Sequence, residues 1–265
     1  MGFLAKIVAA TEGAIARPDY LAGLPMTPRT ASHSLRTAIL EAGPGGALIG
    51  EYKRRSPGAP APELFPPSIE QFVHQTSAGV AAYSCLATTP EFGGAPTDVA
   101  ALAAQTPRPV LFKDFVVDPI QIEAAARSGA SAILLIARLE SDGLLRVPLR
   151  ALARAAHDRG LEVLLEWHER AELRRTEDVP ADVYGVNVRD LDTLEMQPSV
   201  ATETILAAGH FRPLLGLSGV EGPVEAQRFW AAGVDGILVG GALARAPNLR
   251  QFLTSLQRPV MEGRA

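Results

Sequence analysis

Short apolar runs alternate with segments of helical periodicity from about residue 45 onward. Eight of these runs predict strands, and they are mostly apolar throughout rather than alternately apolar and polar. That pattern is typical of parallel strands that are covered on both faces. The predicted strands are 47–52, 81–86, 110–113, 132–136, 162–166, 183–187, 214–217 and 236–239.

The segments between the runs carry apolar residues at helical spacing. Several of them end in glycine where a helix C-cap is expected, such as Gly129 and Gly233. The predicted helices are 69–77, 97–105, 120–128, 149–159, 169–174, 200–208, 224–232 and 248–256.

Eight strand–helix units in one chain predict an α/β fold, a (β/α)8 TIM barrel. The alternative is a doubly wound open sheet, which usually carries a glycine-rich fingerprint after its first strand, whereas Gly50-Glu51-Tyr52-Lys53 is not one. Residues 1–46 are expected to form an N-terminal helical extension packed on the barrel, and 47–265 the barrel itself, within one structural domain. A helix over 27–42 would close the barrel floor or flank the site.

The composition suits a large single core and narrows the class of function. The chain has 265 residues, of which 47% are hydrophobic, and a barrel typically needs about 250. A net charge of −4 without a basic stripe argues against nucleic-acid and membrane-surface partners. No apolar run is long enough for a membrane span. A cytoplasmic protein is expected, as a monomer or weak homodimer.

Neither a metal nor another cofactor is expected. The one cysteine, Cys85, excludes an internal disulfide and a cysteine-rich metal site. The five histidines lack the H-x-x-x-H spacing of zinc sites. His168 follows Glu166 closely, but a single loop histidine is expected to be solvated.

Ionisable and amide side chains stand at the carboxyl ends of several predicted strands. In a barrel these ends converge on one mouth, where active sites lie. Buried charges are costly unless they are paired or used, so this pattern predicts an active site rather than a stabilising device. The residues are Glu51, Lys53, Lys113, Glu166, Asn187 and Arg189.

Small residues follow the seventh and eighth strands, as Ser218-Gly219 and Gly240-Gly241. Glycines there let backbone N–H groups approach a phosphate, and this is the usual phosphate position in barrels. The other interpretation is that they form tight turns, and the residues alone leave both open.

Taken in order, these segments resemble the indole-3-glycerol-phosphate synthase family. Glu51-Tyr52-Lys53-Arg54-Arg55-Ser56-Pro57 resembles the family's E-x-K-x-x-S-P. Three further matches are Phe92-Gly93-Gly94 with F-x-G, Lys113-Asp114-Phe115 with K-D-F, and Gly185-Val186-Asn187-Val188-Arg189-Asp190-Leu191 with G-x-N-x-R-x-L. Leu134-Leu135-Ile136, Leu165-Glu166, Ser218-Gly219 and Val239-Gly240 complete a series running from about residue 47 to 241.

The resemblance implies the barrel enzyme that closes an anilino-deoxyribulose phosphate, 1-(o-carboxyphenylamino)-1-deoxyribulose 5-phosphate, onto its own aromatic ring in tryptophan biosynthesis. Carbon dioxide and water leave, so the enzyme is a carboxy-lyase. It further implies that Lys113 is the general acid and Glu166 the general base of the dehydration. Lys53 would hold the substrate carboxylate and take part in proton transfer, and Glu51 would orient Lys53.

The same resemblance implies the binding residues. Asn187 and Arg189 would position the carboxylate and the sugar hydroxyls. The side chains in contact with the aromatic ring of the substrate would be Phe92, Phe115 and Leu134. The phosphate would be surrounded by Ser56, Ser218, Gly219, Gly240 and Gly241.

Three positions depart from the family pattern. The family's E-S-G is Leu217-Ser218-Gly219 here, which places an apolar side chain where a carboxylate near the substrate is expected. The acidic residue common after the second strand is absent from Ala87-Thr88-Thr89-Pro90. The eighth strand ends in Gly240-Gly241-Ala242, where the family often has a hydroxyl or charged residue.

Several functions therefore stay open. The chain is either a divergent synthase or a paralogue with an altered substrate in specialised metabolism, for which Leu217 would be part of the substrate site. A Schiff-base aldolase using Lys53 or Lys113 is another enzyme class. A non-catalytic protein that binds a phosphorylated ligand is a third.

Overall fold

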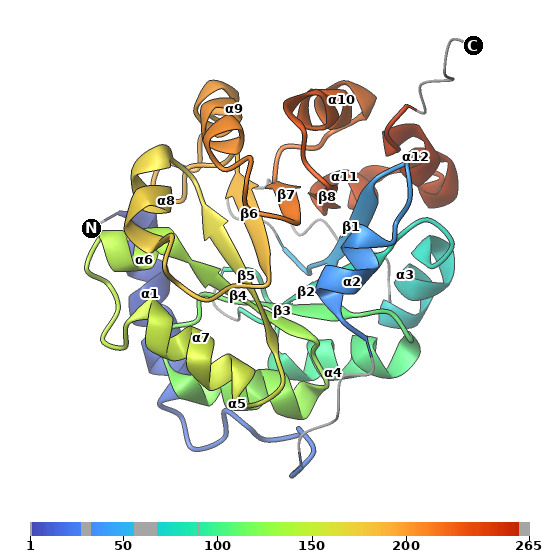
Figure 1. Cartoon of the computed structure of the whole chain (residues 1–265). Coiled ribbons are helices and arrows are strands. Elements are labelled where there is room, and N and C mark those ends of the chain that lie inside the picture. The colour runs from blue at the N-terminus through green and yellow to red at the C-terminus, as the bar shows by residue number, and fades with distance from the viewer. Residues whose placement is uncertain (1, 28–32, 56–67, 89–90, 260–265) are drawn as a thin grey trace.

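Eight parallel strands close into a barrel in the computed structural model, which describes residues 2–27, 33–55, 68–88 and 91–259. The strands pair in chain order, and β8 pairs back with β1. This closure confirms the predicted (β/α)8 fold and excludes the open sheet. Helices form an outer ring around the strands (Figure 1).

Six of the eight strands begin and end at the predicted residues, and the other two differ by one residue at one end. A continuous apolar run specifies a strand covered on both faces closely, because nearly every side chain in it is buried. The strands are β1 Ala47–Tyr52, β2 Ala82–Leu86, β3 Val110–Lys113, β4 Ala132–Ile136, β5 Glu162–Trp167, β6 Val183–Asn187, β7 Leu214–Leu217 and β8 Gly236–Val239.

The predicted helices are present, with ends set by local capping. In α5 the Asp118 side chain accepts a hydrogen bond from the Ile120 N–H, and Gly129 ends the helix in the left-handed conformation. The outer helices are α3 Ile69–Thr76, α4 Pro96–Gln105, α5 Pro119–Ser128, α7 Leu149–His157, α8 Arg170–Thr176, α9 Pro198–Ala207, α10 Pro223–Ala232 and α12 Leu249–Leu256.

Four helices lie outside this regular alternation: α1 Phe3–Ile15, α2 Leu35–Leu40, α6 Ala137–Ser141 and α11 Gly241–Arg245. The helix predicted over 27–42 is shorter than expected, and part of that range lies outside the described residues. Helix α1 lies within the predicted N-terminal helical extension, whereas α6 and α11, each five residues long, were not predicted.

The two N-terminal helices lie at opposite ends of the barrel. Glu162, the first residue of β5, accepts a hydrogen bond of 3.0 Å from the Arg36 N–H, so α2 lies at the floor. Asp192, beyond the end of β6, accepts a hydrogen bond of 3.2 Å from the Leu4 N–H, so α1 begins beside the mouth. Side chains of both helices join the apolar cluster inside the barrel.

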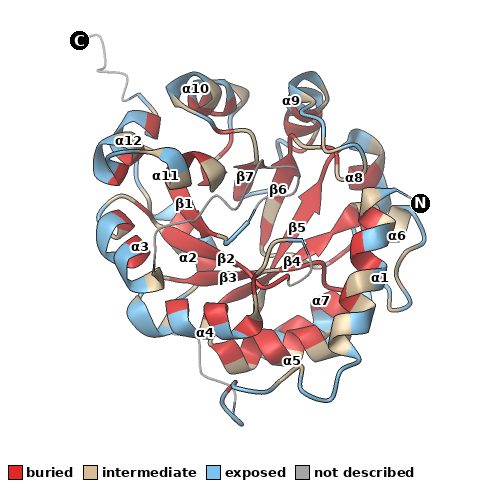
Figure 2. Ribbon diagram, turned by 180° about the vertical axis from the view of Figure 1, so that it is seen from behind, coloured by how far each residue is buried: buried red, intermediate tan, exposed pale blue. Residues whose placement is uncertain are grey.

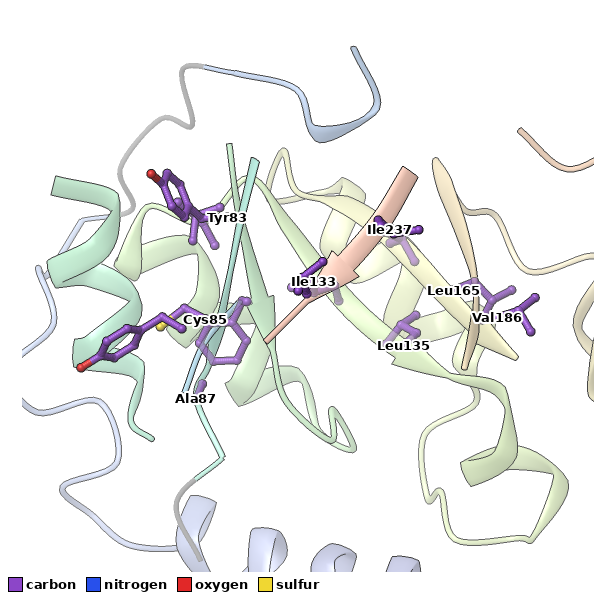
Figure 3. Close-up of a cluster of buried hydrophobic side chains, with 14 of the residues drawn as sticks. Tyr83, Cys85, Ala87, Ile133, Leu135, Leu165, Val186 and Ile237 are labelled. Atoms are coloured by element: carbon purple, nitrogen blue, oxygen red, sulfur yellow. The ribbon is translucent and has the colours of Figure 1, made fainter. Parts of the chain in front are cut away.

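The core has two layers. The inner cluster includes Ile49, Leu111, Leu164, Leu215 and Leu238, which face the barrel interior. The outer cluster fills the space between strands and helices, and burial is concentrated on the strands and the inner faces of the helices (Figure 2). Figure 3 labels eight members of the outer cluster: Tyr83, Cys85, Ala87, Ile133, Leu135, Leu165, Val186 and Ile237.

No helix within the described ranges has the length and apolar character that crossing a membrane requires.

Candidate active site

A cavity of about 390 Å³ lies at the carboxyl ends of the strands. Its lining includes thirteen of the fifteen predicted site residues: Glu51, Lys53, Phe92, Lys113, Phe115, Leu134, Glu166, Asn187, Arg189, Ser218, Gly219, Gly240 and Gly241. A larger and more open hollow of about 1350 Å³ includes residues of α2, α3 and the strand starts, but none of these thirteen. The chemistry predicted from the sequence is therefore concentrated in the smaller cavity.

Strand geometry explains the convergence. Side chains alternate between the barrel interior and the helix layer, so Ile49 and Glu51 point inward from β1 while Tyr52 packs in the outer cluster. By the same alternation Leu164 and Glu166 point inward from β5. Residues more than a hundred positions apart thus meet at one end of the barrel.

Glu51 bridges the two lysines of the site. One carboxylate oxygen lies 3.0 Å from the Lys53 Nζ and the other 3.4 Å from the Lys113 Nζ. Glu51 is 4% exposed. Burial opposes its ionisation, but attraction to Lys53 and Lys113 outweighs burial, so the pKa of Glu51 is lowered. This carboxylate is therefore an anion that holds two ammonium groups at the mouth.

Glu166 has the opposite character. Burial raises its pKa, although Lys113 and a hydrogen bond from Asn187 act in the other direction. The Asn187 Nδ2 donates to the Glu166 Oε1 at 3.0 Å. The other carboxylate oxygen of Glu166, Oε2, is buried and has no hydrogen-bond partner among the described residues. A cavity-lining carboxylate with a raised pKa and one oxygen without a hydrogen-bond partner suits a general base.

Arg189 is held by the segment that follows β6. Its backbone N–H donates to the Asn187 Oδ1 at 2.9 Å, and its guanidinium donates to the Leu194 carbonyl at 2.8 Å. Arg189 also forms an antiparallel bridge with Met196. The segment therefore presents a cation and the Asn187 amide together.

Apolar side chains form one wall of the cavity. The rings of Phe92 and Phe115 lie 6.1 Å apart, and Leu134 lines the cavity with them. Phe3, at the start of α1, and Leu191 add to the lining and were not predicted. No local signal could have identified Phe3, because its contribution depends on where α1 packs.

Small residues form the opposite end, after β7 and β8. Ser218 has a φ of +65°, which is uncommon for a residue other than glycine, and Gly219 follows with +72°. A Cβ at Gly240 would lie 2.3 Å from the Glu51 Oε1, so a larger residue there would displace the Glu51 carboxylate from its position between the two lysines. Glu221 and Arg245 form an ion pair here and line the cavity; neither was predicted as a site residue.

Two predicted residues are not placed in the lining. Ser56 lies outside the described residues. Leu217 is 1% exposed, belongs to the inner cluster beside Gly185, and does not line the cavity. The substitution of the family's Glu by Leu217 therefore adds apolar packing to the barrel interior rather than an apolar wall to the cavity.

Asp114 and Thr88 also line the cavity, beside the end of the Lys113 strand. The Thr88 hydroxyl donates to the Asp114 Oδ1 at 2.6 Å, and the Gln121 amide donates to its Oδ2 at 2.9 Å. Burial raises the pKa of Asp114, against the effect of these hydrogen bonds. The Lys113 carbonyl in turn accepts from the Ala87 N–H at 2.9 Å.

The expectation that His168 is solvated was wrong. Its side chain is 5% exposed and makes hydrogen bonds to the segment around Asn187. Within the described ranges, no three His, Cys, Asp or Glu side chains are grouped so as to hold a metal ion.

Comparisons with known proteins show the family to which the chain belongs. A family model described as indole-3-glycerol phosphate synthase matches residues 6–256. A protein of that name from Staphylococcus aureus (strain USA300) is 37% identical over 224 residues, which cover 82% of each chain. Another from Exiguobacterium sibiricum is 36% identical over 210 residues, covering 79% of this chain and 80% of the relative.

Solved structures show the same fold at low identity. A 3-hexulose-6-phosphate synthase from Salmonella typhimurium aligns with a TM-score of 0.62 at 17% identity, covering 79% of this chain and 96% of the other. A thiamine phosphate pyrophosphorylase from Pyrococcus furiosus aligns with a TM-score of 0.56 at 16% identity, covering 80% and 93%.

Proposed function

The chain belongs to the indole-3-glycerol phosphate synthase family and is a lyase, and we propose that it acts as a carboxy-lyase on 1-(o-carboxyphenylamino)-1-deoxyribulose 5-phosphate. The reaction joins an aromatic carbon to the ketone carbon of the substrate. Carbon dioxide and water leave, and indole-3-glycerol phosphate is the product. One observation carries this proposal: Lys113 and Glu166 line the same cavity from different strands, and the buried Oε2 of Glu166 has no hydrogen-bond partner among the described residues.

The cavity offers a separate surface for each part of the substrate. The wall of Phe92, Phe115 and Leu134 suits the aromatic ring. The turns after β7 and β8, with Gly219, Gly240 and the start of α11, suit the phosphate. Holding both ends of a flexible substrate brings the two reacting carbons together and reduces the entropy cost of ring closure.

Ring closure needs an acid at the ketone oxygen. As the carbon–carbon bond forms, Lys113 gives a proton to that oxygen, which becomes a hydroxyl. The whole sequence contains three lysines, Lys6, Lys53 and Lys113, among 25 lysine and arginine residues. An ammonium can release a proton and a guanidinium cannot, so lysine at the mouth of an otherwise arginine-rich protein supports proton transfer as its role.

Decarboxylation and dehydration follow at the same site. Lys53 and Arg189 lie where they can hold the substrate carboxylate until carbon dioxide leaves and the electron pair returns to the ring. Lys113 first regains a proton from solvent; Glu166 then removes a proton from the substrate while Lys113 protonates the departing hydroxyl as water. Glu51 orients both lysines throughout.

The position of Leu217 favours the ordinary substrate over an altered one. Its side chain does not line the cavity, so its apolar character does not change the wall that faces the ligand. The residues proposed for acid, base and carboxylate recognition are all in the lining.

Fluorescence-monitored turnover of this substrate tests the proposal. The wild-type protein is expected to form the indole product, Lys113→Ala to form none, and Lys6→Ala, altered in α1, to keep the wild-type rate. Folded wild-type protein that binds the reduced, alcohol form of the substrate but yields no indole would refute the proposal.

A further inference from the structure

A buried histidine near the proposed base has no part in the chemistry described so far. His168 follows β5 by one residue and Glu166 by two. Its side chain is 5% exposed, and it is the histidine that lies nearest in sequence to a residue of the cavity lining.

The ring of His168 continues the contact between β5 and β6 where the strand pairing ends. The register between the two strands runs to Trp167 opposite Val186. One residue further, the His168 Nδ1 lies 2.8 Å from the backbone carbonyl of Asn187. The backbone N–H of His168 donates instead to the Glu172 Oε2, at 2.6 Å. An imidazole thus holds the last residue of β6, which carries the amide bound to Glu166.

The other side of the ring is held by the segment after Asn187. The His168 Nε2 lies 3.2 Å from the Gln197 Oε1 and 3.6 Å from the Asp190 Oδ2. Gln197 is itself tied to this segment, because its N–H donates to the Val188 carbonyl at 2.8 Å. Because both ring nitrogens make contacts, the ring cannot turn away from Asn187 without also losing the contacts of Nε2 with Gln197 and Asp190. Since a carbonyl only accepts hydrogen bonds, the Nδ1 must carry a proton.

We propose that His168 is a positioning residue: its Nδ1–H holds the Asn187 backbone and so fixes the amide that hydrogen-bonds the proposed base, Glu166. This inference rests on the proposed function. It assigns no contact between His168 and the substrate; the residue acts through Asn187.

Several charged groups surround Glu166 and His168, and they set how the pKa of Glu166 would respond if the contact between His168 and Asn187 were lost. Lys113, Glu51 and His168 act on Glu166, and Glu172, Asp190 and Arg138 surround His168. The hydrogen bond from Asn187 lowers the pKa of Glu166 against the effect of burial. If Asn187 shifts, the pKa of Glu166 rises further, and the fall of kcat in acid moves to higher pH.

Two substitutions test the hydrogen bond from Nδ1 to the Asn187 carbonyl separately from the contacts of Nε2. The amide nitrogen of Asn can occupy the place of the histidine Nδ1, whereas that of Gln reaches the place of Nε2. His168→Asn therefore keeps the bond to the Asn187 carbonyl, and His168→Gln keeps only the contacts to Gln197 and Asp190. Both substitutions remove any charge that the ring carries, so a shift of the acid limb of the pH profile that is caused by charge alone is the same in the two variants.

The experiment compares kcat, KM and the pH profile of wild type, His168→Asn and His168→Gln. Since small misplacements in an active site can cost about 10²-fold, His168→Gln is expected to lose about tenfold to 10²-fold in kcat and His168→Asn about threefold or less. KM should change little in either, and the acid limb should lie at higher pH in His168→Gln than in His168→Asn. Equal kcat and coincident acid limbs in the two variants would overturn the proposal.

A measurement on the wild-type protein covers the case in which a variant does not fold. Nitrogen-15 NMR of the histidine rings should show a protonated Nδ1 for His168, and an unprotonated Nδ1 would overturn the proposal. Failure of the proposed function looks different: wild-type protein would then form no indole at any pH.

Discussion

Replacing Glu51 with Gln tests how the mouth of the barrel holds two like charges together. The carboxylate lies 3.0 Å from the Lys53 Nζ and 3.4 Å from the Lys113 Nζ. Glutamine has nearly the same shape but no charge. The variant therefore leaves two ammonium groups beside one another without their common counter-ion.

The geometry sets the size of the expected loss. At these distances each attraction amounts to roughly 5 kcal/mol for an effective dielectric constant of about 20. Most of this is offset by the cost of burying the carboxylate, and removing one partner of a buried pair typically destabilises by about 3–5 kcal/mol. The lysine side chains are 16% and 20% exposed, so water screens them in part. We therefore expect a loss of about 3 kcal/mol at neutral pH, the lower end of that range.

Urea unfolding at several pH values measures this loss. The pKa of Glu51 in the folded protein lies below its ordinary value of 4.5, so its stabilising effect is present above pH 4.5 and is lost as the pH falls through the folded pKa. The gap between wild type and Glu51→Gln should accordingly shrink in acid. Turnover should fall as well, because both lysines lose their orientation.

A surface ion pair supplies the control. Glu12 contacts Arg146 at 3.1 Å, with side chains that are 35% and 84% exposed. Glu12→Gln should cost no more than about 1 kcal/mol. If Glu51→Gln loses no more stability than Glu12→Gln, or loses the same amount at pH 7 as below pH 4.5, the argument for a buried counter-ion is refuted.

Three further substitutions have distinct expected outcomes. Glu166→Gln should lower kcat by about 10²- to 10⁴-fold. Because burial raises the pKa of Glu166, the variant should also gain stability over wild type as the pH rises above 4.5. A stability difference in urea unfolding that does not change with pH would contradict this. Gly240→Ala should lower turnover about tenfold or more, because the added Cβ would lie 2.3 Å from the Glu51 Oε1, whereas Gly13→Ala, with no atom within 4 Å of its added Cβ, should leave kcat unchanged. Leu217→Ala should cost about 2–5 kcal/mol of unfolding free energy with little change in KM, and a large rise in KM at unchanged stability would place Leu217 against the substrate.

The strands and the residues at their carboxyl ends could be predicted from the sequence because both depend on short-range pattern. A parallel strand covered on both faces requires a continuous apolar run, so β4, for example, begins and ends where its run does. Once eight such runs alternate with helices, barrel closure brings Lys113 and Glu166 to one mouth, whatever their separation in the chain.

Other features required the packed structure. The place of α1 beside the mouth depends on long-range contacts: Leu4, Ile7 and Val8 are buried in the inner cluster, and the Leu4 N–H donates at 3.2 Å to Asp192, 188 positions away. Phe3 enters the cavity lining because α1 packs there. Glu221 and Arg245 meet only because the turns after β7 and β8 are neighbours in space.

His168 and Leu217 show the division most clearly. The sequence by itself determined the barrel, its strand ends within one residue, and the set of charged groups at its mouth, since these follow from apolar runs and the side-chain alternation along a strand. Only the tertiary structure decided that His168 is buried against Asn187 and that Leu217 packs inside the barrel rather than in the cavity. The depth of a side chain at a strand end depends on its neighbours on adjacent strands, and those contacts are absent from any local pattern.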